Sequence, residues 1–208
     1  MGGLDVRAVT PRDCTLAVAI PLTRVEFLDD LRAPEKDFAK SYARRFGGFS
    51  DDDVWTRYER YARLVRSVAD EVEAAGVRVI RGARFAALTA ALTERHVFTL
   101  VAHWRNHEHD AARGRIELTD GLREIDDVVA AIPPDYRGVI DLTVCHSVLL
   151  GDGIARLRPD CVVIMNRGNA KLDYRCIVYR HVIRQISHRP ESYVDVVARL
   201  RVALLKGD

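Results

Sequence analysis

The sequence predicts an α/β protein in which a mostly parallel sheet lies between two layers of helices. Short apolar runs alternate along the chain with segments whose apolar residues recur at helical spacing. Two of these runs, Val97–Trp104 and Gly138–Ser147, are almost uninterrupted, as expected of strands buried on both faces. This alternation is typical of a three-layer α/β/α sandwich. We expect one domain over residues 1–208, because two compact domains would leave each with a small core.

The first half of the chain predicts two strands and two long helices around a weakly patterned segment. Residues 1–13 form an irregular lead-in, and from Arg24 to Asp53 only the stretch VEFLDDL favours a short helix. A longer helix is predicted over Val54–Ala75, where apolar residues recur at helical spacing between an acidic amino end and Gly76. The other predicted elements are a strand at Cys14–Thr23, a strand at Val77–Ile80 and a helix at Ala83–Arg95.

The second half continues the alternation on either side of the run that ends in Ser147. The polar segment Arg105–Gly114 predicts a surface loop, and Ile116–Gly121 predicts an edge strand and a turn. A helix follows over Leu122–Ile132, because Pro133 and Pro134 end its apolar pattern. The glycines at 47, 48, 151 and 153 predict turns. The remaining predicted elements are a strand at Cys161–Met165 and helices at Tyr174–Ile186 and Glu191–Leu205.

The composition excludes several classes of protein. The 32 basic and 30 acidic residues are interspersed, so no basic stripe of the kind that binds nucleic acid is expected. No apolar run approaches the roughly 18 residues of a membrane span, and the start of the chain lacks the apolar core of a secretory signal. We therefore expect a cytoplasmic protein. Its four cysteines, Cys14, Cys145, Cys161 and Cys176, are expected to be thiols.

Two reactive side chains stand at the ends of the two most apolar runs. The first run reaches His103 and the second reaches Cys145. The carboxyl ends of parallel strands share one edge of a sheet, where ligands and chemistry collect. If the two strands are neighbours, an imidazole and a thiol meet at that edge. This pairing is what a cysteine nucleophile requires, because the imidazole can take the thiol proton and later return it to the leaving group.

The order of these features resembles that of caspase-like cysteine peptidases of clan CD. A histidine closes one strand, an edge element with the sequence IELTDG and a helix follow, and a cysteine closes the next strand. The segment IELTDGLREIDDVV is most similar to the bacterial CHAT branch of that group. The tripeptide Cys145-His146-Ser147 is similar to the Cys-His-Ser segment of metacaspases. The resemblance spans about Thr15 to Leu204, and its specific part is Val97–Ser147.

The resemblance implies an endopeptidase that cleaves protein substrates without a metal or other cofactor. His103 would be the general base and acid, and Cys145 would be the nucleophile. Backbone N–H groups of Cys145 and of Trp104 or Arg105 would form the oxyanion hole. The residues expected to contact the substrate are Asp141, Thr143, His146 and Asn166. The resemblance further implies a role in a bacterial defence or programmed-death module, switched on by a separate activator or regulatory protein.

Three alternatives remain open on the sequence alone. Trp104 stands where the family has glycine, and Thr143 stands where metacaspases have an acidic residue, so a catalytically degenerate scaffold that binds a partner is the first alternative. Strand alternation would point Asp141, Thr143 and Cys145 to one face. A zinc site is the second alternative, with ligands from His103, His107 and His109 together with Cys145 or His146. A small-molecule or nucleotide-binding α/β domain is the third, although the chain has no glycine-rich strand-to-helix turn.

Overall fold

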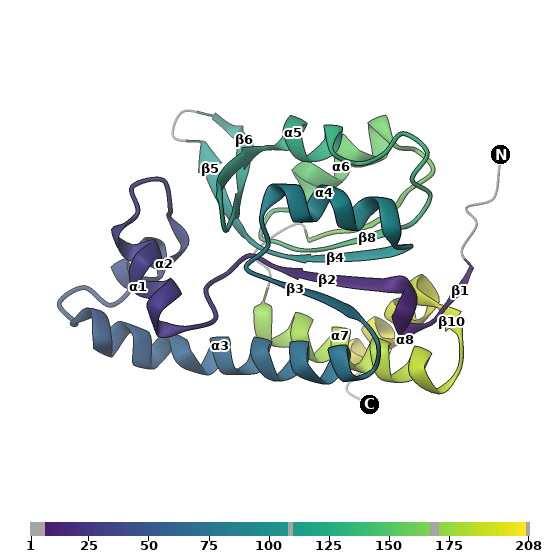
Figure 1. Cartoon of the computed structure of the whole chain (residues 1–208), viewed down its shortest axis with the longest axis horizontal. Helices are drawn as coiled ribbons and strands as arrows, with labels where there is room; N and C mark the ends of the chain where they lie inside the picture. The colour runs from purple at the N-terminus through teal and green to yellow at the C-terminus, as the bar shows by residue number, and fades with distance from the viewer. Residues whose placement is uncertain (1–6, 108–109, 167–170, 207–208) are drawn as a thin grey trace.

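A five-stranded parallel sheet lies at the centre of the computed structural model, which describes residues 7–107, 110–166 and 171–206 (Figure 1). The strands are β2 (Cys14–Val18), β3 (Arg78–Arg81), β4 (Val97–Val101), β8 (Val139–Thr143) and β9 (Val162–Ile164). Their order is β3-β2-β4-β8-β9, and every neighbouring pair is parallel. The prediction of a mostly parallel sheet is confirmed, and the two most apolar strands, β4 and β8, are neighbours.

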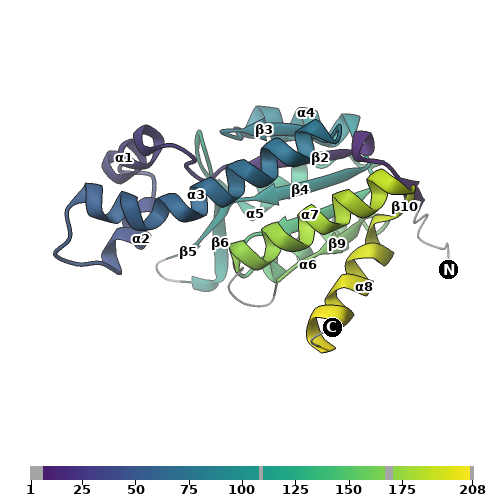
Figure 2. The ribbon, with the colours of Figure 1, turned by 90° about the horizontal axis from the view of Figure 1, so that it is seen from below.

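Helices cover both faces of the sheet and complete the three layers (Figure 1). The first face is covered by α3 (Asp51–Ala74), α7 (Leu172–His188) and α8 (Tyr193–Lys206). Figure 2 shows α3 and α7 side by side across this face. The second face is covered by α4 (Phe85–Glu94), α5 (Ile125–Ala130) and α6 (Val148–Leu157).

Each face of the sheet has its own hydrophobic core, because side chains of a strand alternate between the two faces. Leu16 on β2 and Val101 on β4 join the first core, whereas Ala17 and Leu100 join the second core. The first core lies under α3, α7 and α8, and includes Leu16, Val18, Val65, Val68, Val97, Val101, Val139, Val182, Ile186 and Tyr193. The second core lies under α4, α5 and α6, and includes Leu88, Phe98, Leu100, Trp104, Ile116, Val128, Ile140, Leu142, Leu150 and Ile154.

A small antiparallel sheet follows β4 where the sequence predicts a surface loop and the start of a helix. Its strands are β5 (His103–His107), β6 (Asp110–Leu118) and β7 (Gly121–Glu124), in the order β5-β6-β7. The loop prediction for Arg105–Gly114 is therefore wrong, and the helix after it is limited to α5. Ile116 and Leu118 anchor β6 in the second core, and Gly121 at a φ of 118° makes the turn into β7. Much of β6 is polar, so it lacks the alternation of apolar and polar residues from which a strand is predicted. Its pairing with β5 on one side and β7 on the other forms the strand.

Trp104 is held in this small sheet by the absence of a side chain at Gly114. A Cβ atom at Gly114 would lie 1.8 Å from the Cζ2 atom of the indole, so only glycine leaves room for the ring. Trp104 is opposite Ile116 in the pairing of β5 with β6, and both side chains are buried in the second core. Because neighbouring residues of a strand point to opposite faces, His103 is directed away from the second core.

A helical arm, residues 23–49, projects beyond the sheet beside the amino-terminal end of α3 (Figure 1). It contains α1 (Arg24–Arg32), which the sequence predicts, and α2 (Phe38–Arg44), which it does not. Thr23 and Glu26 form a capping box at the start of α1, and Ser50 caps α3. An aromatic cluster joins the arm to α3, and includes Phe27, Tyr42, Trp55 and Tyr58.

Three further differences from the predicted elements concern α6 and the chain ends. Helix α6 occupies a segment in which the sequence predicts turns at Gly151 and Gly153. A Cβ atom at Gly151 would lie 2.7 Å from the sulfur of Met165, so glycine here allows the helix to pack closely against the end of β9. Near the ends of the chain, β1 (Ala8–Val9) pairs with β10 (Glu191–Ser192), and a 3-10 turn covers Pro11–Asp13.

Within the described part of the chain, no helix has the length and apolar character needed to cross a membrane.

Candidate functional site

The carboxyl ends of β4 and β8 bring His103 and Cys145 to one edge of the central sheet. Val101 and Thr143 are direct partners in the parallel pairing of these strands. His103 follows Val101 by two residues, and Cys145 follows Thr143 by two residues. Neighbouring strands lie about 4.8 Å apart, so the two residues leave the sheet from adjacent positions. The structure therefore places His103 and Cys145 directly after neighbouring strands.

The imidazole of His103 is mostly buried against the helical arm. Its ring lies 5.1 Å from the ring of Phe38, measured between centroids, and its Nε2 atom lies 3.9 Å from Oδ2 of Asp37. Burial lowers the pKa of His103 from 6.5 to about 4, and the positive charges of Arg45 and Arg105 act in the same direction, while Asp37 opposes them. The imidazole is therefore neutral at pH 7, the state in which one ring nitrogen can accept a proton.

Asp37 is fixed by contacts to the strand that pairs with β5. Glu117 on β6 is the direct cross-strand partner of His103, and its carboxylate is buried. The backbone N–H groups of Asp37 and Phe38 donate to Oε2 of Glu117 at 2.8 Å and 3.1 Å. Burial raises the pKa of Glu117, and these N–H donors oppose that shift. The hairpin of β5 and β6, which carries His103, thus also holds the arm against the imidazole.

Cys145 lies in the short connection between β8 and α6 and packs against the second core. The expectation that Asp141, Thr143 and Cys145 share one face is wrong for the cysteine, because β8 ends at Thr143 and strand alternation ends with it. Cys145 is half-buried, whereas the other three cysteines are buried. Burial raises the pKa of Cys161 to about 11 and that of Cys176 to about 12, and it raises the pKa of Cys14 further. Those three thiols are poorly placed to react.

The connection after Cys145 is a tight and well-anchored turn. His146 is exposed and has a φ of 50°, a left-handed conformation that costs a residue with a side chain about 1 to 2 kcal/mol. Ser147 is buried at the start of α6, and its hydroxyl accepts the backbone N–H of Asn166 at 2.8 Å. The side-chain amide of Asn166 donates to the carbonyl oxygens of Leu142 and Val144. Asn166 thus braces the turn that presents Cys145.

Asp141 and Thr143 face the first core and contact Arg175 and Tyr193. Arg175 donates to the Asp141 carboxylate and, at 3.2 Å, to the hydroxyl of Thr143. The hydroxyl of Tyr193 donates to Oδ2 of Asp141 at 2.8 Å. All four side chains are buried. In this arrangement Asp141 and Thr143 join α7 and α8 to the sheet, and the expectation that they contact a substrate finds no support.

The zinc alternative gains no support from the part of the chain that the structure describes. No group of three or more histidine, cysteine, aspartate or glutamate residues is arranged there to hold a metal ion. The prediction that His109 contributes a ligand falls outside the described residues.

The backbone groups expected to form an oxyanion hole belong to the same edge of the sheet as His103. They are those of Cys145 and of Trp104 or Arg105.

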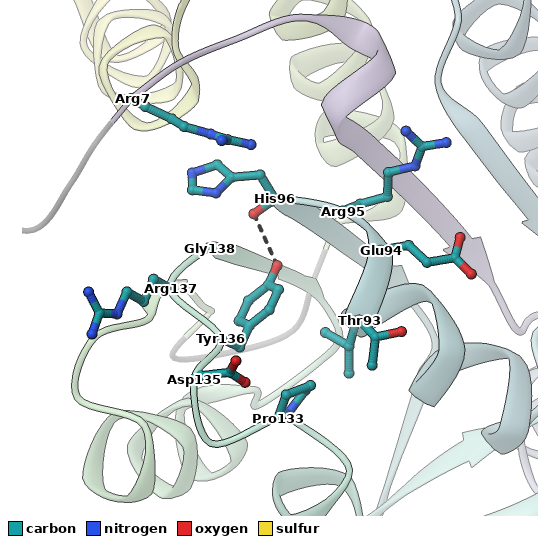
Figure 3. Close-up of a pocket in the computed structure, with 11 residues that line it drawn as sticks. Arg7, Thr93, Glu94, Arg95, His96, Pro133, Asp135, Tyr136, Arg137 and Gly138 are labelled. Atoms are coloured by element: carbon teal, nitrogen blue, oxygen red, sulfur yellow. Dashed lines mark hydrogen bonds between the residues drawn. The ribbon is translucent and has the colours of Figure 1, made fainter.

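Two hollows in the surface differ in their relation to this edge. A hollow of about 440 Å³ lies at the opposite edge, where β4 and β8 begin; Figure 3 shows the side chains of Arg7, His96 and Arg137 around it. The hydroxyl of Tyr136 donates to the carbonyl oxygen of His96 there. A second hollow, of about 180 Å³, lies beyond the carboxyl end of β2 and is lined by residues that include Ala19, Pro21, Asp30, Lys36 and Thr119. Only the second hollow is close to the arm that contacts His103.

Asp37 is the residue of this site that the sequence prediction misses. It lies in the weakly patterned segment before α3, and 66 positions separate it from His103. The only local signal is that an aspartate precedes a short apolar stretch, as at many helix amino ends.

Comparison with family models, with curated proteins and with solved structures gives no match to this chain.

Proposed function

We propose that this chain is a caspase-like cysteine peptidase in which Cys145 is the nucleophile and His103 is the general base. One observation carries the proposal: the two residues stand at equal distances, in sequence, beyond the paired residues Val101 and Thr143. The thiol and the imidazole thus belong to residues that follow adjacent parallel strands at the same edge of the sheet. Resting enzymes often hold such pairs beyond hydrogen-bond distance until the substrate binds.

The chain between the two residues supports the same proposal. The sequence IELTDG forms the end of β6 and the turn into β7, and α5 then leads back to β8. This is the order of edge element, helix and strand followed by cysteine on which the resemblance to caspase-like peptidases rests. The three-layer arrangement of the helices and the parallel sheet is compatible with that fold.

The proposed reaction proceeds by acyl transfer. His103 accepts the proton of the Cys145 thiol, and the thiolate sulfur forms a bond to the carbonyl carbon of a peptide group. Backbone N–H groups at this edge stabilise the resulting oxyanion, an effect worth about 3 to 4 kcal/mol for one donor. The protonated His103 then gives its proton to the leaving amine as the C–N bond breaks. Water, deprotonated by His103, hydrolyses the thioester and restores the thiol.

The proposed substrates are proteins, and the proposed setting is a bacterial defence or programmed-death module. Both follow from the resemblance, which also implies control by a separate activator. The hollow beside Pro21 and Lys36 offers space for part of a polypeptide on the arm side of the edge. Full activity of the purified chain on its natural substrate would argue against a separate activator.

A binding module without catalytic activity is the second candidate. It is favoured by the different neighbours of the two side chains: His103 contacts the arm, while Cys145 packs against the second core. The indole of Trp104 also occupies the position at which the family has glycine. In this alternative the edge would bind a partner protein and the thiol would have ordinary reactivity.

Thiol reactivity separates these two candidates. Native protein is treated with iodoacetamide at pH 7, and the rate of alkylation at each cysteine is measured by peptide mass spectrometry. The peptidase proposal predicts that Cys145 reacts at least 10-fold faster than a cysteine in an unstructured peptide, and that His103→Gln abolishes this acceleration. Cys161→Ser serves as the matched control and should leave the rate at Cys145 unchanged. Peptide-library cleavage by the wild type that Cys145→Ala removes would complete the case.

Ordinary reactivity would favour the binding module. If Cys145 reacts no faster than the unstructured peptide and its rate is the same in the His103→Gln variant, the imidazole does not act on the thiol. Exposure alone cannot mimic the predicted result, because it would accelerate Cys145 equally with and without His103.

A further inference from the structure

We propose that Asp37 is the positioning residue for His103, holding the ring with its proton on Nε2 so that Nδ1 is the nitrogen that receives the proton of Cys145. The inference rests on the proposed function and extends it to a third residue. A histidine that acts as a base requires a fixed tautomer, which a group beside its other nitrogen sets. Asp37 is the carboxylate that lies on the Nε2 side of this ring, at 3.9 Å.

The carboxylate of Asp37 does not cap the helix at whose start it lies. Asp37 is the N-cap residue of α2, where an aspartate ordinarily accepts a backbone N–H of its own helix. Here it forms no such hydrogen bond. Its Oδ1 atom instead accepts a hydrogen bond from Arg44 at 2.6 Å, and its Oδ2 atom faces His103. The carboxylate is therefore oriented by the Arg44 side chain at the other end of α2, and not by backbone N–H groups at the start of the helix.

The backbone around Asp37 is anchored from both sides to the strand opposite His103. Lys36, which is buried, donates through its ammonium group to the carbonyl oxygen of Leu118, and Asp37 and Phe38 donate through their N–H groups to Glu117. Three consecutive residues of the arm thus bind two consecutive residues of β6. Because Glu117 and His103 are cross-strand partners, the strand pair that carries the imidazole also fixes the position of the carboxylate.

The ring itself has little freedom to turn away. The aromatic ring of Phe38 lies against the imidazole at an interplanar angle of 57°, and only 19% of the His103 side chain is exposed. Among the described residues, the charges that act on the imidazole are those of Asp37 from the arm, Arg45 beyond the end of α2 and Arg105 on β5; Glu117 on β6 is turned to the backbone of the arm. Of these, Asp37 supplies the negative charge, and the two arginines oppose protonation of the ring.

The tautomer of His103 tests the inference directly. Side-chain ¹⁵N chemical shifts distinguish a proton on Nε2 from a proton on Nδ1, and the His103 signals are assigned by their loss in His103→Gln. The wild type should show the Nε2–H tautomer in excess at pH 7. Asp37→Asn should lose that excess and lower the pKa of His103 below its wild-type value, because the carboxylate that favours protonation is gone. Asp37→Glu should restore part of both effects.

Asp29→Asn is the matched control, since it makes the same chemical change at an exposed position of the same arm. It should leave the His103 tautomer and pKa at their wild-type values. Circular dichroism and thermal unfolding show that each variant is folded. Asp37→Asn keeps the backbone N–H that donates to Glu117, so it preserves the anchoring of the arm.

The alkylation rate of Cys145 links the tautomer to the chemistry. It should fall about 10-fold in Asp37→Asn and be unchanged in Asp29→Asn. An unchanged tautomer in Asp37→Asn overturns the inference, whether or not the wild type is a peptidase. A tautomer that depends on Asp37, combined with a wild-type Cys145 of ordinary reactivity, overturns the peptidase proposal instead and leaves Asp37 as a residue that only orients the ring.

Discussion

The buried pair of Asp141 and Arg175 allows a quantitative test of how much Asp141 contributes to stability. In Asp141→Asn the charge of Arg175 stays buried without its partner, because both side chains are at most 5% exposed. Breaking such a pair from one side costs about 3 to 5 kcal/mol. The neutral amide keeps the shape of the carboxylate, so the cost arises from the uncompensated guanidinium and from the weakened hydrogen bond of Tyr193.

Urea unfolding measures this cost. With an m-value of about 2.5 kcal/mol/M, the midpoint of Asp141→Asn should fall by about 1 to 2 M. The double variant Asp141→Leu, Arg175→Met replaces both charges by apolar groups and should recover most of the loss, since such exchanges are often neutral or stabilising. A midpoint shift below about 0.4 M in Asp141→Asn, or a double variant less stable than the single one, would refute the reasoning.

Three further predictions concern single positions. His103 has a pKa of about 4 in the folded protein and 6.5 when unfolded, so the unfolded chain binds the proton first and stability should fall by up to about 3 kcal/mol between pH 6.5 and pH 4; His103→Gln should remove this part of the pH dependence in urea titrations. Gly114→Ala should destabilise the fold by about 1 to 3 kcal/mol, because the new methyl group would overlap the ring of Trp104, whereas Gly47→Ala, with no atom within 4 Å of its added carbon, is the control; equal thermal shifts for the two variants would contradict this account. His146→Val should lower stability by about 1 to 2 kcal/mol because a β-branched residue fits a φ of 50° poorly, and His146→Gly should be close to wild type; similar unfolding midpoints for these two variants would show that the turn relaxes.

The central sheet could be predicted because its strands carry their own signal. The runs Val97–Val101 and Val139–Thr143 are buried on both faces, and seven of their ten residues are apolar. The helix over Asp51–Ala74 likewise shows its buried face in the spacing of its valines and tyrosines. In these elements the local pattern and the tertiary environment agree.

The small antiparallel sheet and the arm could not be predicted in the same way, because distant partners determine them. Glu117 receives N–H groups from a segment about 80 residues earlier, and no local pattern reports such a contact. The polar strand β6 is stabilised by pairing with β5 and β7, which its own sequence does not indicate. Helix α2 is short, and its stability comes from packing against the aromatic cluster.

The candidate site, too, could be predicted only where local sequence determines it. The placement of His103 and Cys145 after neighbouring strands could be predicted, because the two most apolar runs lead to them and the ends of parallel strands share an edge. The direction of the Cys145 side chain could not, since the alternation rule fails where β8 ends and the sequence does not mark that residue. Asp37 could not be predicted because only the folded arm brings it to the imidazole.

The continuity of α3 gives the arm a fixed angular relation to the sheet. One uninterrupted helix of 24 residues, about 36 Å long, carries Trp55 and Tyr58 in the aromatic cluster and Val65 and Val72 in the first core. Each residue of an α-helix advances the side-chain direction by about 100°. Inserting a single residue between Tyr58 and Val65 would therefore turn the aromatic face away from the arm while leaving the sheet-covering half in place. The angular phase of this one helix determines whether the arm, and with it Asp37, reaches the edge of the sheet.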